Sequence, residues 1–275
     1  MLGKRILTAI VGIPIIIYAI NYGQWVFAIA VMLLALIAWH EYSTMMKKKE
    51  INVGYYPGMI IIVFFVGCSW LGNADETILV IMLLIIYVLA GTVFSYSHFS
   101  IADAAFTVLG ICYIGLTFAH LLMLRFTEQS QYINTNMGEL SVGAIYVWLA
   151  FIGTWASDTF AFFIGSKLGR HRLCPAVSPG KTYEGVIGGF IGSLTGVLAF
   201  GSLAYLPYIH LVLIGLLIGI AAPLGDLVES ALKRYAGVKD SGNILPGHGG
   251  ILDRFDAMMI TVPAVFYYIN FFVLH

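Results

Sequence analysis

Polar residues are unusually dense in one segment, KDSGNILPGHGGILDRFD (residues 239–256). Asp253 and Asp256 are three residues apart, so a helix that began there would turn both carboxylates the same way. Carboxylates with one His and no Cys suit a hard cation such as Mg²⁺, which usually takes one or two protein carboxylates plus substrate phosphates. The glycines would let backbone N–H groups approach a phosphate, although a flexible turn is the simpler interpretation.

A second polar segment, PLGDLVESALKRYAG, leads up to the first one. Asp226, Glu229, Ser230 and Lys233 follow one another at i, i+3, i+4 and i+7, which predicts one stripe of a helix. A soluble helix with this stripe would simply be solvated. Here the preceding residues are apolar enough for a membrane, so a functional site is favoured.

A third segment, SPGKTYEG (residues 178–185), contains Gly-Lys-Thr but is not a P-loop. The first glycine of that motif is missing, and no β-strand is predicted before it. Ser178 and Pro179 are instead typical of the cap and first position of a helix. We therefore expect a helix N-terminus that presents Lys181 and Thr182 to the same polar pocket.

Asp158 lies in the apolar run that precedes this segment, about two turns from the end of its predicted span. A carboxylate at such a depth is costly unless it is paired or coordinated, so it is a candidate functional residue. A structural pair with a nearby Lys or Arg is an equally good interpretation.

Carboxylates, several cations and glycine-rich backbone together are typical of phosphoryl or nucleotidyl transfer. A phosphate nucleophile is already ionised, with a second pKa of about 6, so no general base is needed. The difficulty is to bring two polyanions together, which cations achieve. Residue chemistry alone thus predicts a metal-dependent enzyme that acts on a phosphate-containing substrate at the membrane surface.

The elements that must position these residues are predicted to be membrane helices. Of the 275 residues, 60% are apolar and 10% are charged, and the mean hydropathy is +0.92. Roughly 20 apolar residues cross the hydrocarbon layer as a helix. We therefore expect an all-α, polytopic integral membrane protein with about nine spans. The predicted spans are residues 6–22, 24–40, 57–72, 77–95, 104–124, 142–165, 185–206, 210–225 and 257–274.

The distribution of basic residues predicts the orientation of these spans. If the N-terminus is cytoplasmic, every Lys and Arg except Arg125, of 14 in all, falls on the cytoplasmic side. We expect a single membrane domain, 1–275, with N-terminal transmembrane helices in 1–150 and a catalytic transmembrane region in 151–275. It would be a multi-pass protein of the cell membrane, the inner membrane of a bacterium, with its active site facing the cytoplasm.

Read as one string, SALKRYAGVKDSGNILPGHGGILDRFD (residues 230–256) resembles the signature of the CDP-diacylglycerol synthases, also called phosphatidate cytidylyltransferases. The upstream Ser178, Lys181, Thr182, Glu184 and Gly185 also match that family, whereas Gly180 stands where many members have a second Lys. Residues 1 to about 150 carry no motif of the family.

The resemblance implies that CTP and phosphatidic acid react to give CDP-diacylglycerol and pyrophosphate, with the lipid phosphate attacking the α-phosphate of CTP. It implies Mg²⁺ held by Asp226 and Asp253, with Asp256 next, an accessory monovalent cation such as K⁺, and a homodimer among membrane lipids. It implies no nucleic-acid partner. The residues expected to act in catalysis are Asp226, Asp253, Asp256, Lys233 and Arg234. The residues expected to bind substrate are Ser178, Lys181, Thr182, Glu184, Ser230, Lys239, Asp240, His248 and Arg254. His248 could equally order the glycine turn.

Three other functions remain open at this point. A lipid kinase would release a nucleoside diphosphate instead of pyrophosphate. A CDP-alcohol phosphotransferase would need a paired-aspartate motif that the sequence lacks. A transporter would use Asp158 and Asp226 as ligands of a coupling ion, but transporters usually place such groups in both halves of the chain.

Overall fold

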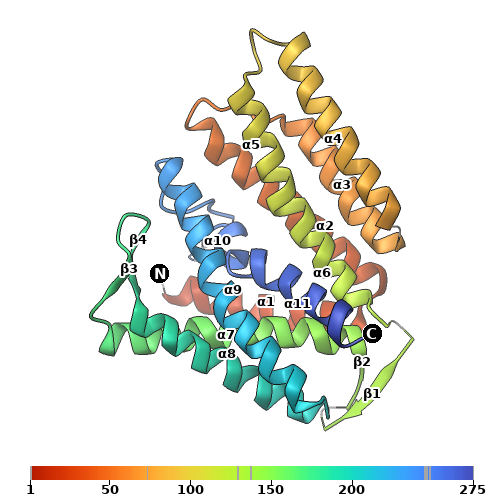
Figure 1. Ribbon diagram of the computed structural model, residues 1–275, viewed down its shortest axis with the longest axis vertical. Coiled ribbons are helices and arrows are strands. Elements are labelled where there is room, and N and C mark those ends of the chain that lie inside the picture. Colours follow the sequence, from red (N-terminus) through yellow and green to blue (C-terminus); the bar gives the residue numbers. More distant parts are fainter. Residues whose placement is uncertain are drawn as a thin grey trace. The chain divides into compact units, whose positions relative to one another are not determined.

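The computed structural model describes residues 2–72, 74–128, 130–136, 138–244, 247 and 249–274, and Figure 1 shows that it is built almost entirely of helices. The expected all-α membrane fold is confirmed, with two short hairpins added. The chain forms two compact units. Unit 1 is Met1–Met123 with Lys233–Arg254, and unit 2 is Leu124–Leu232 with Phe255–His275.

Unit 1 contains the N-terminal helices and a segment from near the end of the chain. Its elements are α1 (Leu2–Tyr22), α2 (Gln24–Lys47), α3 (Tyr55–Leu71), α4 (Ala74–Phe94), α5 (Ile101–Ile111), the π-helical turn η1 (Cys112–Leu116), most of α6 (Thr117–Phe126), and α10 (Leu252–Phe255). Helices α3, α4 and α5 lie side by side (Figure 1). The described parts of this unit are therefore helix packed on helix.

Helix α2 lies at the centre of unit 1, and two fully buried aromatic residues fix its position. The Trp39 indole donates to the Tyr55 carbonyl at 2.8 Å, and the Tyr42 hydroxyl donates to the Phe106 carbonyl at 2.8 Å. Gly110 lies directly against the Tyr42 ring, with no room for a side chain. Each buried polar tip is thus paired, as the membrane interior requires.

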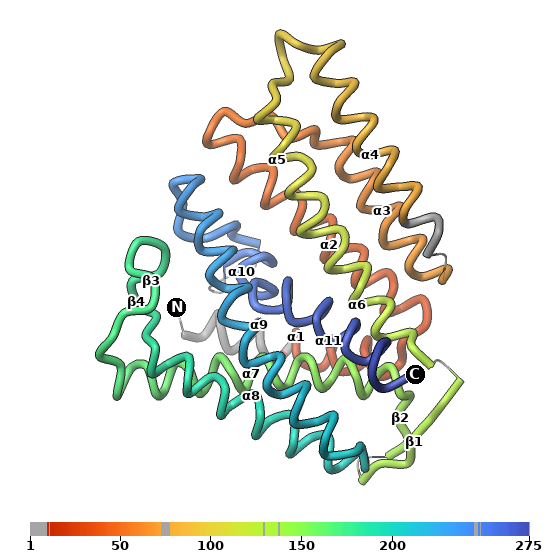
Figure 2. Tube along the Cα trace, viewed as in Figure 1, coloured from red at the N-terminus to blue at the C-terminus, as the bar shows by residue number. Residues whose placement is uncertain are grey.

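Unit 2 contains the central helices. Its elements are β1 (Tyr132–Thr135), β2 (Gly138–Ser141), α7 (Val142–Leu168), β3 (Arg172–Cys174), β4 (Ser178–Thr182), α8 (Tyr183–Leu203), most of α9 (Tyr208–Tyr235) and α11 (Met258–Phe272). Each hairpin is antiparallel, with Tyr132 opposite Ser141 and Arg172 opposite Thr182. Figure 2 shows that the β3–β4 hairpin leads directly into α8.

Helices α7 and α8 run alongside each other, and the glycines of α8 allow their close approach (Figure 1). A Cβ on Gly192 would lie 2.4 Å from the Ala156 carbonyl, and a Cβ on Gly188 would lie 2.8 Å from Ile164. Small residues at such spacing are what membrane helices use for tight packing. The pair is therefore a fixed platform for the residues at its ends.

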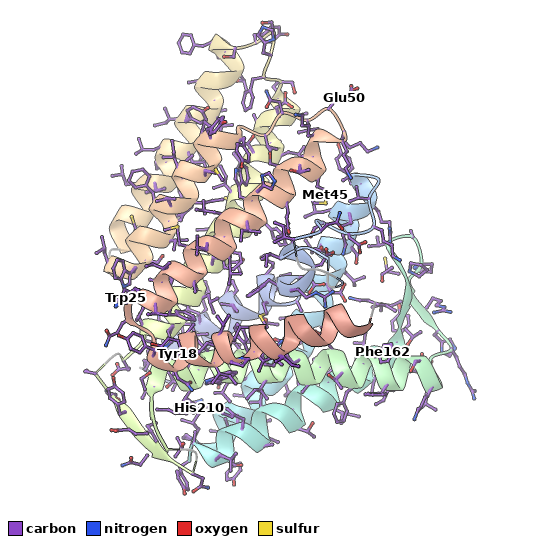
Figure 3. The ribbon with its side chains drawn as sticks, turned by 180° about the vertical axis from the view of Figure 1, so that it is seen from behind. Tyr18, Trp25, Met45, Glu50, Phe162 and His210 are labelled. Carbon is purple, nitrogen blue, oxygen red and sulfur yellow. The ribbon has the colours of Figure 1, made fainter. Side chains whose placement is uncertain are left out.

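Eight of the nine predicted apolar stretches each fall mainly on one helix of the structure, whereas the stretch 104–124 is divided among α5, η1 and α6. Five helices are long and apolar enough to cross a membrane: Gln24–Lys47, Ile101–Phe126, Val142–Leu168, Tyr183–Leu203 and Tyr208–Tyr235. The shorter apolar helices are Gly12–Tyr22, Tyr55–Leu71, Ile78–Phe94 and Met258–Phe272. Large apolar side chains project outward, among them Tyr18, Trp25 and Phe162 (Figure 3). The molecule is a membrane protein, while the number of spans and the cytoplasmic N-terminus stay predictions.

Two expectations about helix starts are wrong. Ser178–Thr182 is strand β4 and not a helix N-terminus, because it pairs with β3, and Thr182 caps α8 by accepting the Gly185 N–H at 3.1 Å. The last long helix does not begin at Asp253. That residue lies in the short α10, and α11 begins only at Met258, so Asp253 and Asp256 do not share one regular helix.

Candidate active site

Unit 2 contains a cavity of about 630 Å³ where α7, the β3–β4 hairpin, α8 and α9 meet. Its polar lining is supplied by Ser157, Asp158, Ser166, Arg172, Ser178, Lys181, Thr182 and Asp226. Glycines of α7 and α8 form much of the remaining wall. A large cavity with a few converging polar groups is the usual form of a ligand site.

Lys181 and Asp226 form an ion pair in the lining of this cavity. The Lys181 ammonium lies 2.6 Å from an Asp226 carboxylate oxygen and donates to the Pro223 carbonyl at 3.3 Å. Their side chains are 20% and 33% exposed, so both can be reached from the cavity. The structure therefore brings together two residues that the sequence placed in separate motifs.

Three carboxylates share this region of unit 2. Asp158 lies within electrostatic range of Asp226, Asp256 and Lys181. Like-charged carboxylates within such range favour the binding of a cation. Asp158 was expected to have either a site role or an ion pair, and it lines the cavity.

These carboxylates fit a divalent ion that also binds substrate. Among the described residues, no three His, Cys, Asp or Glu side chains are arranged as a complete metal site. Mg²⁺ rarely needs one, because it commonly takes one or two carboxylates and completes its shell with phosphates and water. Asp226 and Asp256, with Asp158 beside them, are suitable donors.

Gly225 brings α9 close to the chain around Asp256. A Cβ at Gly225 would lie 2.5 Å from the Asp256 carbonyl and 2.8 Å from that of Ala257, so only glycine fits. Asp256 itself accepts the Ala257 N–H at 2.8 Å. The position of Asp226 therefore depends on the absence of a side chain at Gly225.

The predicted stripe of α9 is helical, as expected. The Ser230 hydroxyl donates to Asp226 at 3.4 Å, one turn away, and Glu229 is buried, with 1% of its surface exposed. Ser230 therefore orients the Asp226 carboxylate, and its contact with substrate stays a prediction.

Glu184 has protein partners that the sequence did not predict. Its carboxylate accepts the backbone N–H groups of Arg170 and His171 at 3.1 and 3.3 Å, and it lies 2.7 Å from the His171 ring nitrogen Nδ1. These contacts fix the turn between α7 and β3. Substrate binding by Glu184 stays a prediction.

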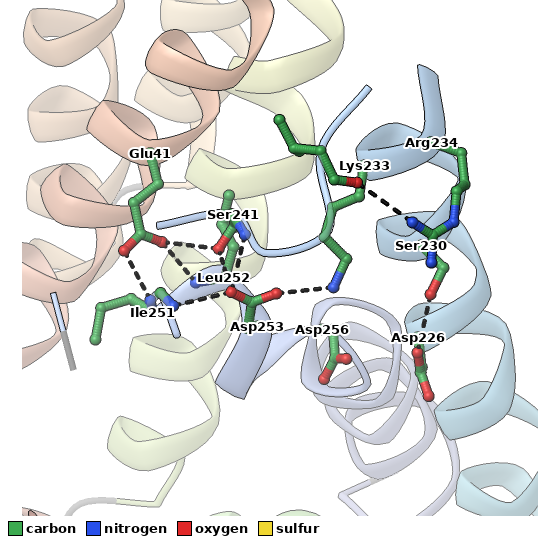
Figure 4. A network of polar contacts seen from close by, with 12 residues as sticks. Glu41, Asp226, Ser230, Lys233, Arg234, Ser241, Ile251, Leu252, Asp253 and Asp256 are labelled. Atoms are coloured by element: carbon green, nitrogen blue, oxygen red, sulfur yellow. Dashed lines mark hydrogen bonds and ion pairs between the residues drawn. The ribbon is translucent and has the colours of Figure 1, made fainter. Parts of the chain in front are cut away.

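Asp253 is the centre of a polar network within unit 1 (Figure 4). One carboxylate oxygen lies 2.7 Å from the Lys233 ammonium. The other accepts the Ser241 N–H at 2.9 Å, the Ser241 hydroxyl at 2.9 Å and the Gly250 N–H at 2.8 Å. Asp253 thus organises the glycine-rich segment, a role that the sequence did not predict; its predicted role as a metal ligand stays a prediction.

The network determines the charge of Asp253, whose side chain is 6% exposed. Burial raises the pKa of Asp253, but the hydrogen bonds and charge of Lys233 and the N–H groups of Gly250 and Ser241 outweigh burial and lower this pKa to about 2. The carboxylate is therefore ionised at neutral pH.

The C-terminal end of α9 is closed by Gly237. The Val238 N–H donates to the Lys233 carbonyl at 2.9 Å and the Gly237 N–H donates to the Arg234 carbonyl at 3.1 Å, with Gly237 at φ +70°. This is a Schellman motif, in which glycine is favoured because the backbone is left-handed. This turn ends α9 just after Lys233 and Arg234 and thereby fixes the position of their backbone.

The other expected substrate-binding residues of this segment are more open. Arg234 donates to the Val238 carbonyl at 3.4 Å. Arg234, Lys239, Asp240 and Arg254 are exposed. His248 lies outside the described residues, so its expected role stays a prediction.

Glu41 is a candidate functional residue that our sequence reasoning missed. It lies in α2, far from every quoted motif, and its carboxylate accepts from Ser241, Ile251 and Leu252 (Figure 4). A signal was present, because Glu41 is a carboxylate directly at the end of the predicted apolar span 24–40. We overlooked Glu41 because residues 1–150 carry no motif of the family.

Comparisons with known proteins place the chain in a family. The model of the cytidylyltransferase family matches residues 3–272. A phosphatidate cytidylyltransferase of Bacillus subtilis (strain 168) is 33% identical, with 98% of both chains covered. Proteins of the same name from Staphylococcus haemolyticus (strain JCSC1435) and Staphylococcus aureus (strain COL) are each 38% identical, with 94% of this chain and 95% of theirs covered. The chain belongs to the cytidylyltransferase family.

Proposed function

We propose that this chain transfers the cytidylyl group of CTP to phosphatidic acid. An oxygen of the lipid phosphate forms a bond to the α-phosphorus of CTP, and the bond from that phosphorus to the bridging oxygen breaks. Pyrophosphate leaves with the electron pair, and CDP-diacylglycerol is the product. The shared name of the relatives supports these substrates.

The observation that carries this proposal is the Lys181–Asp226 pair in the unit 2 cavity. It sets a cation for a polyphosphate beside a carboxylate for a metal ion, in a cavity of about 630 Å³ that is large enough for part of a nucleotide. Phosphate groups bind both point-charge Lys and fork-shaped Arg. The cavity thus has the chemistry that CTP requires.

Lys181 and Arg172 neutralise the triphosphate in unit 2. Lys233, Arg234, Lys239 and Arg254 supply the positive charge of the signature segment, where Asp253 holds Lys233 in place. Asp226 and Asp256 would hold Mg²⁺, which would stabilise the charge that develops on the phosphate oxygens. A ligand role for Asp253 and a second, monovalent cation such as K⁺ stay predictions.

The reaction needs no side chain as a general base. The lipid phosphate is ionised near neutral pH, so it attacks without prior loss of a proton. This agrees with the described lining of the cavity, which offers carboxylates and cations but no His.

The direct test is to incubate the purified protein in detergent with labelled CTP, phosphatidic acid and Mg²⁺. The label should enter a lipid, with one pyrophosphate released for each. Release of CDP with a phosphorylated lipid would identify a kinase instead. Substrate flux into proteoliposomes without CTP turnover would identify a transporter.

The same proposal includes a location and an assembly. We propose a multi-pass protein of the cell membrane that acts as a homodimer, with Lys239 and Arg254 facing the cytoplasm. A Cys introduced at exposed Lys239, in a variant without the three native cysteines, should react with a membrane-impermeant maleimide only in inside-out vesicles. Mass measurement in detergent should give twice the 30.1 kDa of one chain.

A further inference from the structure

We propose that Glu41 is a positioning residue for the reaction: from α2, it sets the conformation of residues 241–242 and 250–253 and thereby the direction of the Asp253 carboxylate. The effect on turnover rests on the function proposed above. The effect on the conformation of the segment does not.

The contacts of Glu41 all lead to this one segment. One carboxylate oxygen accepts the Ile251 N–H at 2.9 Å, and the other accepts the Leu252 N–H at 3.0 Å. The second oxygen also lies 3.2 Å from the Ser241 hydroxyl. The Glu41 side chain therefore joins both ends of the glycine-rich segment, 200 to 211 residues further along the chain.

Ser241 links Glu41 to Asp253. Its hydroxyl lies 3.2 Å from Glu41 and 2.9 Å from Asp253, and its single proton can serve only one of them at a time. Its N–H donates to Asp253 at 2.9 Å. Displacement of Ser241 would therefore remove two of the donors that hold Asp253 opposite Lys233.

The segment is shaped to receive this carboxylate. A Cβ on Gly242 would lie 2.6 Å from one Glu41 oxygen, and a Cβ on Gly250 would lie 2.5 Å from the other. Both glycines approach Glu41 so closely that a side chain would collide with it. Gly250 also donates its N–H to Asp253 at 2.8 Å, so the residue that contacts Glu41 is itself a partner of Asp253.

Burial explains why this role needs a carboxylate. Glu41 is 2% exposed, and a buried charge is costly unless it is hydrogen-bonded. A carboxylate offers only acceptors, which suits two N–H groups and a hydroxyl. Glu41→Gln keeps the shape of the side chain, but its NH₂ group is a donor that faces other donors of the glycine-rich segment. This change should displace that segment while α2 stays in place.

The test compares Glu41→Gln with Glu50→Gln, the same change at an exposed position just after α2. Two properties are measured in each full-length protein: kcat and KM for CTP, and hydrogen exchange of backbone amides. We expect Glu41→Gln to lower kcat on the order of tenfold while KM for CTP changes by less than about threefold. Amides of residues 241–253 should exchange faster, and those of α7 and α8 should not. Glu50→Gln should match the wild type.

Unchanged kcat in Glu41→Gln, or faster exchange throughout the protein, would overturn the proposal, the second result because it indicates general loss of structure. If Glu41→Gln does not fold, Ser241→Ala takes its place, with a loss of kcat and faster exchange in the segment expected again. If the wild type itself releases no pyrophosphate, the proposed function fails, but hydrogen exchange still tests whether Glu41 holds the segment.

Discussion

The Lys181 ammonium lies 2.6 Å from the Asp226 carboxylate, although the whole of α8 separates the two residues in the chain. The glycine-mediated packing of α8 on α7 holds one end of this pair, and α9 carries the other. The Lys181 ammonium in this cavity can exchange its partner, because an incoming phosphate can replace the Asp226 carboxylate.

Loss of the Lys181 charge should weaken the use of CTP. We expect Lys181→Met to lower kcat/KM for CTP by roughly 100-fold, because the cavity then keeps its carboxylates without their cation. Lys167→Met removes an exposed charge from the same unit and should have little effect. Equal kinetics of the two variants would remove Lys181 from the nucleotide site.

Replacement of Asp253 should abolish most activity without unfolding the protein. In Asp253→Asn, an amide NH₂ faces Lys233 or the N–H groups of Ser241 and Gly250, so we expect kcat to fall by at least about 100-fold. Glu139→Gln, an exposed change in β2, is the matched control. Near-normal turnover of a folded Asp253→Asn protein would contradict both its organising role and its role at a metal.

The ionisation of Asp253 predicts how stability depends on pH. Its folded-state pKa of about 2 lies below the ordinary value of 3.8, so its contribution is complete above pH 4 and is lost as the pH falls toward 2. This lowering of the pKa corresponds to a contribution on the order of 2 kcal/mol to the free energy of unfolding. Thermal unfolding of the metal-free protein in detergent should show a constant difference between wild type and Asp253→Asn from pH 5 to 8, which shrinks below pH 4. A difference that changes around pH 6 would assign the effect to another group.

A methyl group at Gly225 should disturb the site through the backbone. We expect Gly225→Ala to push α9 away from the Asp256 carbonyl, at a cost of about 1–3 kcal/mol in stability, and to raise the Mg²⁺ concentration needed for half-maximal activity. Gly67→Ala has no atom within 4 Å of the new Cβ and serves as the control. An unchanged Mg²⁺ requirement would show that this contact does not position Asp226 and Asp256.

Divalent-ion binding can be measured without turnover. Mn²⁺ titrations followed by electron paramagnetic resonance should detect a bound ion, and Asp226→Asn and Asp256→Asn should each weaken its binding by at least about tenfold. Chelation by EDTA should stop the reaction and added Mg²⁺ should restore it. If both variants bind Mn²⁺ like the wild type, the ion is held elsewhere.

The helices could be predicted from the sequence because a long apolar run is a local property. The ends of the helices depend on longer-range contacts. The run at 210–225 continues as helix to Tyr235, where Gly237 closes it. Ser178 and Pro179 have the types of a helix start, yet they pair with β3, and Pro179 is tolerated in a two-stranded hairpin because such strands have free edges.

The types of the site residues could be predicted, but their pairing could not. Asp226, Asp253, Lys181 and Lys233 were predicted as site residues one by one, and those roles stay predictions, whereas the pairs Lys181–Asp226 and Lys233–Asp253 depend on how the chain folds back. Glu41 was missed for the same reason, because its partners are about 200 residues away.

That separation has a consequence for biosynthesis. α2 leaves the ribosome long before Ser241, Ile251 and Leu252, so Glu41 is synthesised before its three donors. A nascent chain arrested before residue 241 lacks all of them, and its α2 should insert less stably than that of the finished protein. Unit 1 can therefore be completed only after residue 254 has been translated, later than residues 124–232 of unit 2.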